Sequence, residues 1–231
     1  MPVKLAESKP VGFTFAPDGR IAAMEKEQPD PDIMASLQPE VLISAYAQGI
    51  FPMVQDGELM WFRPPLRGLL PLDERFHVSR SLARTIGRGR FECTIDRSFD
   101  DVVRLCADRP DGRQTWISPE IRLAYARLHE LGFAHSIEAW PVEKADPGEP
   151  LGGLYGVALG GAFFGESMFH TVTDAGKVAL AYCVEHLRGR GFALFDIQWT
   201  TPNLLRFGAY ETPHDQYVEL LREALDAKVQ F

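Results

Sequence analysis

The sequence lacks the features that mark membrane, secreted and metal-binding proteins. It has no apolar run long enough to span a bilayer, and no apolar stretch follows the charge at its start. Its six histidines are scattered without a ligand motif such as HExxH. Its cysteines are few and widely spaced: Cys93, Cys106 and Cys183. We therefore expect a protein of the reducing cytoplasm, with no secretory signal, disulfide framework or metal site.

A global excess of positive charge is also missing, because the formal net charge is −8. This argues against non-specific nucleic-acid binding. Locally, however, residues 63–90 contain seven arginines and two acids. Ser79 or Ser81 can cap a helix there, and arginines at every fourth position would then line one face: Arg80, Arg84 and Arg88. The stripe is either a solvated helix face or an anion-binding surface for a phosphate backbone.

The order of expected elements predicts an α+β fold. Residues 1–33 read as a loosely structured segment, with a small hairpin at 12–21 and a linker at 29–32. Residues 34–90 suit a small N-terminal domain, with a helix at 39–48, strands at 59–62 and 68–70, and the arginine-bearing helix. A loop is expected at 144–149. From residue 91 we expect strands at 91–95, 135–140, 151–159, 162–168, 192–198 and 209–211, and helices at 98–107, 118–132, 174–190, 203–207 and 214–227.

Residues 91–231 therefore form a largely antiparallel sheet flanked by helices. The helix bracketed by strands near the end resembles the core of acyltransferase folds. The glycine loop that would hold the pyrophosphate of coenzyme A is not evident, because the glycines at 189 and 191 end a helix and do not begin one.

Two segments about 30 residues apart look like a site. One strand follows Gly160 and carries the lone carboxylate Glu166 among aromatic residues. The other carries Asp196 and Gln198, which strand alternation places on the same face. Polar groups in apolar strands are costly to bury without partners. The pair is either part of a site or a satisfied buried hydrogen-bond pair.

Eight motifs together resemble the leucyl/phenylalanyl-tRNA–protein transferase family, and they run in order from about residue 40 to the end. They are AYAQGIFP at 45–52, HVSRS at 77–81, TWI at 115–117, LHELG at 128–132, AHS at 134–136, GGLYGVA at 152–158, FGESMF at 164–169 and FGA at 207–209.

The resemblance implies a metal-free and coenzyme-free enzyme with a small N-terminal domain and an acetyltransferase-like (GNAT-type) C-terminal domain. Its substrates would be Leu-tRNA or Phe-tRNA and proteins beginning with Arg or Lys. The transferred residue would mark those proteins for degradation. We expect a cytoplasmic monomer.

The chemistry of the side chains also indicates roles for individual residues. Gln198 can orient the attacking amine, and Asp196 can hold Gln198. Glu166, with Ser167, can bind a cationic acceptor side chain, or else form a structural ion pair. An apolar pocket for Leu or Phe, or a plain core, would comprise Leu154, Phe163, Met168 and Leu187.

The remaining roles concern the tRNA. Trp61 and Trp116 match family positions that hold its terminal adenosine, or they are half-buried core aromatics. The arginine stripe would carry its backbone.

Several residues depart from the family pattern near the site. They include Met53, His170 and residues 200–203. They leave open an altered acceptor specificity or a noncatalytic tRNA-binding homologue. A coenzyme-A-dependent N-acetyltransferase is the alternative from another substrate class.

Overall fold

The computed structural model describes residues 37–55, 58–108, 115–142 and 148–231. Its elements run in the order α2 (Pro39–Ala47), β1 (Phe51–Gln55), β2 (Glu58–Phe62), β3 (Leu66–Leu69), α3 (Arg80–Gly87), β4 (Phe91–Ile95), α4 (Phe99–Ala107), α5 (Pro119–Glu130), β5 (Ala134–Pro141), β6 (Gly152–Leu159), β7 (Ala162–His170), α6 (Ala175–Arg190), β8 (Leu194–Gln198), α7 (Pro202–Leu205), β9 (Tyr210–Pro213) and α8 (His214–Leu225). The segment expected at 1–33, its hairpin and linker, and most of the loop at 144–149 lie outside the described residues.

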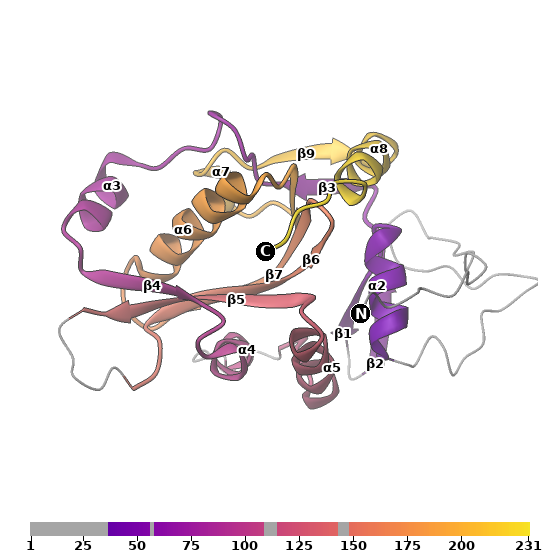
Figure 1. The fold of residues 1–231 in the computed structure, drawn as a ribbon, viewed down its shortest axis with the longest axis horizontal. Helices are drawn as coiled ribbons and strands as arrows, with labels where there is room; N and C mark the ends of the chain where they lie inside the picture. The colour runs from indigo at the N-terminus through magenta and orange to yellow at the C-terminus, as the bar shows by residue number, and fades with distance from the viewer. Residues whose placement is uncertain (1–36, 56–57, 109–114, 143–147) are drawn as a thin grey trace, which may run out of the picture.

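A seven-stranded sheet in the order β4-β5-β6-β7-β8-β3-β9 forms the centre of the molecule. The helix α6 covers one face, whereas α4 and α5 lie on the other side of the sheet (Figure 1). A separate hairpin of β1 and β2 lies beside α2 (Figure 1). The α+β class with a mixed, mostly antiparallel sheet and flanking helices is confirmed.

Local sequence signals account for most of these elements. The helix α5 begins at Pro119, where the Ser118 hydroxyl accepts from the backbone N–H of Ile121 at 3.3 Å. The helix α6 ends at Gly191, whose φ of 83° suits glycine. The strand β1 was not expected, because Pro52 argues against a central strand. It is tolerated because, among the residues that the structure describes, β1 pairs only with β2.

The parallel pairing of β7 with β8 is short, and the sheet opens beyond it. The two strands pair only from Ala162↔Leu194 to Phe164↔Asp196. Just beyond, each strand carries one extra residue relative to its other neighbour. Glu166 is extra in β7, where Gly165 and Ser167 face consecutive residues of β6, and Ile197 is extra in β8 opposite β3. Such bulges bend strands and redirect side chains, so β7 and β8 separate at this level.

Two elements that precede residue 90 pack with the large sheet. The strand β3 lies between β8 and β9, and α3 lies against α6. The expected boundary between an N-terminal domain at 34–90 and a catalytic domain at 91–231 stays a prediction. No helix in the described part of the chain is both long and apolar enough to cross a membrane.

Candidate active site

A cavity of about 250 Å³ opens where β7 and β8 separate. Most of its wall is apolar, and its polar side chains come mainly from the ends of these two strands. The lining residues are Phe51, Met53, Trp116, Leu154, Gly165, Glu166, Ser167, Met168, Leu180, Phe195, Ile197, Gln198, Trp199, Thr201 and Leu204. An apolar recess with a few convergent polar groups is the usual form of a ligand site.

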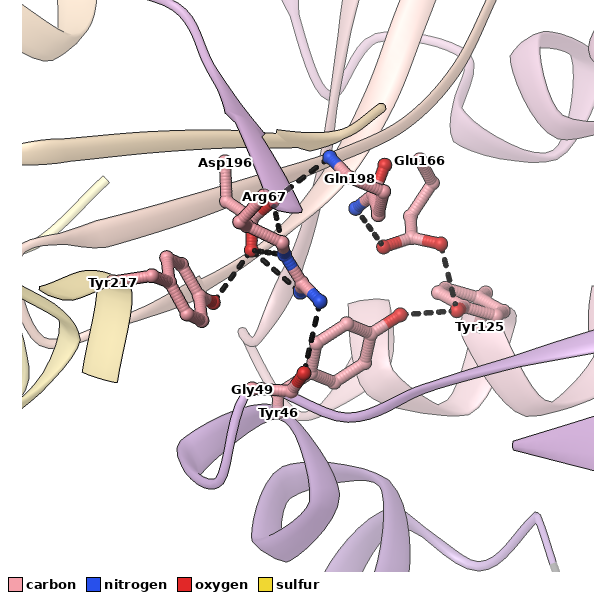
Figure 2. A network of polar contacts seen from close by, with 8 residues as sticks. All are labelled: Tyr46, Gly49, Arg67, Tyr125, Glu166, Asp196, Gln198 and Tyr217. Atoms are coloured by element: carbon pink, nitrogen blue, oxygen red, sulfur yellow. Dashed lines mark hydrogen bonds and ion pairs between the residues drawn. The ribbon is translucent and has the colours of Figure 1, made fainter. Parts of the chain in front are cut away.

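Glu166 and Gln198 meet at this cavity, as the sequence predicted (Figure 2). The side-chain amide of Gln198 donates a long hydrogen bond of 3.4 Å from Nε2 to Glu166 Oε1. Both residues occupy irregular backbone positions, because Glu166 is the bulge residue and Gln198 has a φ of 55°. Strained backbone of this kind concentrates at functional sites.

Two buried tyrosines support the carboxyl group of Glu166. The Tyr125 hydroxyl donates to Glu166 Oε2 at 3.0 Å, and the hydroxyl of Tyr46 contacts that of Tyr125 (Figure 2). Burial raises the pKa of Glu166 to about 7, and the negative charge of Asp196 adds to this rise. The two tyrosines and Arg67 oppose the rise. Glu166 can therefore change its charge close to neutral pH.

Asp196 belongs to a different, fully buried cluster. Arg67 binds it through Nε at 2.9 Å from each carboxylate oxygen and through Nη2 at 2.7 Å from Oδ2. Tyr217 donates to Oδ2 at 2.6 Å, and the backbone N–H of Gln198 donates to Oδ1 at 2.8 Å. Asp196 and Arg67 have no exposed side-chain surface. Asp196 thus holds Gln198, as the sequence allowed, and it does so through the backbone N–H of Gln198.

Arg67, like Tyr217, belongs to this cluster and was not predicted from the sequence. Burial alone would lower the pKa of its guanidinium, but the Asp196 carboxylate raises it above its usual range. Its Nη1 donates to the carbonyl of Gly49 at 2.9 Å, and its guanidinium lies 4.7 Å from the ring centroids of Phe51 and Tyr217. From its sequence context, Arg67 was counted toward a cationic surface. The available signal was a lone charge within an apolar strand.

The apolar pocket differs from the expected one. Leu154 and Met168 line the cavity, but Phe163 and Leu187 do not, and both of these have no exposed surface. Phe163 packs against Phe195 at 5.2 Å between centroids. Leu187 lies seven residues along α6 from Leu180, which does line the cavity, and this corresponds to about 10 Å along a helix. For these two residues the structure favours the alternative of a plain core.

The two tryptophans that were expected to hold the adenosine differ in their exposure. Trp116 is half-buried and lines the cavity. Trp61 is 3% exposed and packs in the core, so its ring offers almost no open face. Its burial follows from pairing with the unexpected strand β1, where it lies opposite Pro52. The cavity has a second indole, that of Trp199, which the sequence analysis did not assign a role.

The arginine stripe forms as expected on α3. The Ser79 hydroxyl caps this helix by accepting from the backbone N–H of Leu82 at 3.3 Å. Within the described ranges no carboxylate pairs with the three exposed arginines, Arg80, Arg84 and Arg88. The positive charge available over residues 63–90 is smaller than the seven arginines of this segment suggest. Arg67 pairs with Asp196, and Arg75 pairs with Asp73.

The chain is similar to known proteins along most of its length. The family model described as leucyl/phenylalanyl-tRNA protein transferase matches residues 69–222, and the model for its N-terminal domain matches residues 35–65. The chain is 49% identical over 192 residues to a leucyl/phenylalanyl-tRNA–protein transferase of Akkermansia muciniphila, covering 82% of this chain and 97% of that protein. A protein of the same name from Herpetosiphon aurantiacus is 50% identical over 195 residues, covering 84% of this chain and 98% of that protein.

Among solved structures, FemX is similar with a TM-score of 0.48 and 12% sequence identity, over 76% of this chain and 66% of that chain. The structure of L-PGS from Bacillus licheniformis is similar with a TM-score of 0.41 and 14% identity, over 69% of this chain and 50% of that chain.

Proposed function

Because the chain belongs to the leucyl/phenylalanyl-tRNA–protein transferase family, we propose that it is an aminoacyltransferase that moves leucine or phenylalanine from aminoacyl-tRNA to the α-amine of a protein. The observation that carries this proposal is the pairing of Glu166 with Gln198 at the edge of an apolar cavity. An apolar recess suits the side chain of Leu or Phe, and the polar pair suits an incoming amine.

The reaction is the aminolysis of an ester, so the protein mainly has to position two substrates. The amine nitrogen bonds to the ester carbonyl carbon, and the bond from that carbon to the tRNA ribose oxygen breaks. The amine loses one proton and the ribose oxygen gains one, so the proton count closes without another reactant. No metal or coenzyme is required for this step.

Gln198 is the residue we assign to orient the amine. Its Nε2 is turned toward Glu166, so its Oε1 is left to accept a hydrogen bond from the amine. Asp196 acts indirectly, because it accepts a hydrogen bond from the backbone N–H of Gln198 and does not line the cavity. We therefore assign Asp196 as a positioning residue.

Glu166, with Ser167 beside it, is the group we assign to the acceptor's first side chain. Both line the cavity, and Glu166 is half-buried. A cation that enters stabilises the carboxylate form and lowers the pKa of Glu166 from its raised value. This supports acceptors that begin with Arg or Lys. We further propose that the product is directed to degradation.

The donor side of the site is proposed from the remaining residues. Leu154 and Met168, with Leu180 and Ile197, would hold the Leu or Phe side chain. Trp116 would stack on the terminal adenosine, while Trp61 would support that wall from the core.

The exposed arginines of α3, Arg80, Arg84 and Arg88, would contact tRNA phosphates in a salt-dependent manner. We propose a monomer acting in the cytoplasm, where the widely spaced thiols stay reduced.

The test is the transfer of labelled Leu or Phe from charged tRNA to peptides that begin with Arg, Lys, Asp or Glu. Transfer to Arg and Lys peptides is expected. Transfer to Asp or Glu peptides instead would show an altered acceptor specificity. Binding of charged tRNA without any transfer would identify a noncatalytic homologue, and a rise in melting temperature with acetyl-CoA would favour an N-acetyltransferase.

A further inference from the structure

Trp199 is the part of the cavity that the reaction described above leaves unused. It directly follows Gln198, lines the same cavity and leaves 42% of its surface exposed. An indole is large and apolar on its faces, and tryptophan side chains are highly buried on average. Its exposure next to the reacting groups makes an aromatic surface available to a substrate.

The indole is held in place and not loosely attached. Its ring makes edge contacts with Phe51 at 5.1 Å and Phe62 at 6.2 Å between centroids. Its backbone N–H donates to the carbonyl of Ile197 at 2.6 Å. Strand β3 passes so close that a Cβ on Gly68 would lie 2.7 Å from the Trp199 carbonyl carbon. A rigid aromatic surface loses little entropy when a ligand binds to it.

The position of Trp199 favours the acceptor over the donor. Glu166 lies on β7 and Trp199 directly follows the end of β8, and both line the cavity. Gln198 links them, because its side-chain amide donates to Glu166 and its backbone continues into Trp199. An amine oriented by Gln198 would therefore lie beside a residue that contacts Glu166 and precedes Trp199. On the basis of the proposed function, we propose that Trp199 forms a cation–π wall that receives the acceptor's cationic first side chain together with Glu166.

The indole would add a contact that does not depend on the charge of Glu166. Burial raises the pKa of that carboxyl toward neutral pH, so its charge varies with conditions. The face of an indole attracts a cation at any pH. A planar guanidinium also stacks on an aromatic face, whereas an ammonium is a compact and strongly hydrated charge. Trp199 should therefore favour arginine over lysine at the acceptor's first position.

The experiment compares Trp199→Leu and Trp199→Phe with the unchanged full-length enzyme. The acceptors are otherwise identical peptides that begin with Arg, Lys or citrulline, which keeps the planar shape of arginine without its charge. The measurements are KM and kcat for each peptide, the Kd for aminoacyl-tRNA, and the melting temperature. Trp116→Leu is the matched control, since it removes the other indole of the cavity.

Trp199→Leu should raise the KM for the Arg peptide about two- to thirtyfold, which is the range of one cation–π contact. The Lys peptide should change less, and the citrulline peptide and the Kd for tRNA should stay constant. Trp199→Phe should retain part of the effect with an unchanged melting temperature. Trp116→Leu should leave the ratio of Arg to citrulline KM values unaltered.

Three results would overturn the role of Trp199. Weakened aminoacyl-tRNA binding with unchanged peptide KM values would place the indole at the donor. An equal rise for Arg and citrulline would show stacking without a charge contribution. Unchanged constants in both variants would show an inert side chain. The failure of the proposed function looks different, because the unchanged enzyme would then transfer nothing or would not prefer Arg to citrulline.

Discussion

Two polar clusters lie side by side and share Gln198, yet they differ in burial and in the length of their hydrogen bonds. The cluster of Asp196, Arg67 and Tyr217 is sealed, and each carboxylate oxygen accepts short hydrogen bonds of 2.6–2.9 Å (Figure 2). The cluster of Glu166 lines the cavity, and its bond to Gln198 is long at 3.4 Å. Gln198 contributes its backbone to the first cluster and its side chain to the second.

The comparison shows how one fold separates support from reactivity. A buried carboxylate that is saturated with donors has no remaining capacity for a substrate. A half-buried carboxyl with a raised pKa can change its charge and its partners when a ligand arrives. We therefore expect substitutions in the sealed cluster to act on stability and those in the open cluster to act on turnover.

The largest effect should come from breaking the sealed cluster with Arg67→Met. This change leaves the Asp196 carboxylate buried without its cation and should lower the free energy of unfolding by about 3–5 kcal/mol. Denaturant unfolding measures the change. Arg75→Met is the control, since Arg75 pairs with Asp73 in an exposed position and should change stability little. Equal effects of the two substitutions would remove the distinction between the clusters.

A substitution at the shared residue should act on catalysis. Gln198→Asn tolerates the left-handed backbone that Gln198 adopts, but its amide no longer reaches Glu166. We expect kcat to fall about 10²-fold, the effect of losing one well-placed polar group at a reacting centre. The melting temperature should change by only a few degrees. A large loss of stability with normal turnover would instead indicate that Gln198 is a structural residue.

Glu166→Gln should sharpen the difference between the clusters through its pH dependence. Glu166 has a pKa of about 7 in the folded protein and an ordinary value of 4.5. The folded state therefore binds more protons between these values, and the stability that this provides below pH 4.5 is lost as pH rises through 7.

The free energy of unfolding of the unchanged protein should accordingly fall, relative to Glu166→Gln, across this window. The KM for Arg peptides should decrease as pH rises through 7 in the unchanged enzyme only. Denaturation at several pH values and peptide kinetics measure the two effects. Parallel pH profiles for both proteins would show that Glu166 does not titrate there.

The smallest effect is expected for Tyr125→Phe. This change removes the hydroxyl that donates to Glu166 at 3.0 Å and favours its charged form. The midpoint of the KM profile should move upward by a fraction of a pH unit. A midpoint that moves downward would mean that the hydroxyl stabilises the neutral acid.

The sequence predicted the elements of this fold better than the details of its site. Periodicity and capping residues such as Ser118 and Gly191 are local signals, and they placed nearly every helix and strand. Polar residues in apolar strands drew attention to Glu166 and Gln198, which do meet. Arg67 was missed because its partner Asp196 is 129 residues away, and only the pairing of β3 with β8 brings them together.

The pocket could not be outlined from sequence for a related reason. Phe163 and Met168 belong to the same strand, but one lies before the point where β7 leaves β8 and the other lies after it. Bulges depend on the register with a partner strand, so neither the extra residue at Glu166 nor the turn of Gln198 has a local signature.

The short parallel contact between β7 and β8 should also divide the backbone amides by their rates of hydrogen exchange. Amides on their facing edges share interstrand bonds only up to Phe164 and Asp196. In heavy water, protons on the paired side of that level should exchange slowly, and those facing the cavity should exchange much faster. A bound substrate should slow the second group alone, so the gap in the sheet provides a built-in reporter of occupancy.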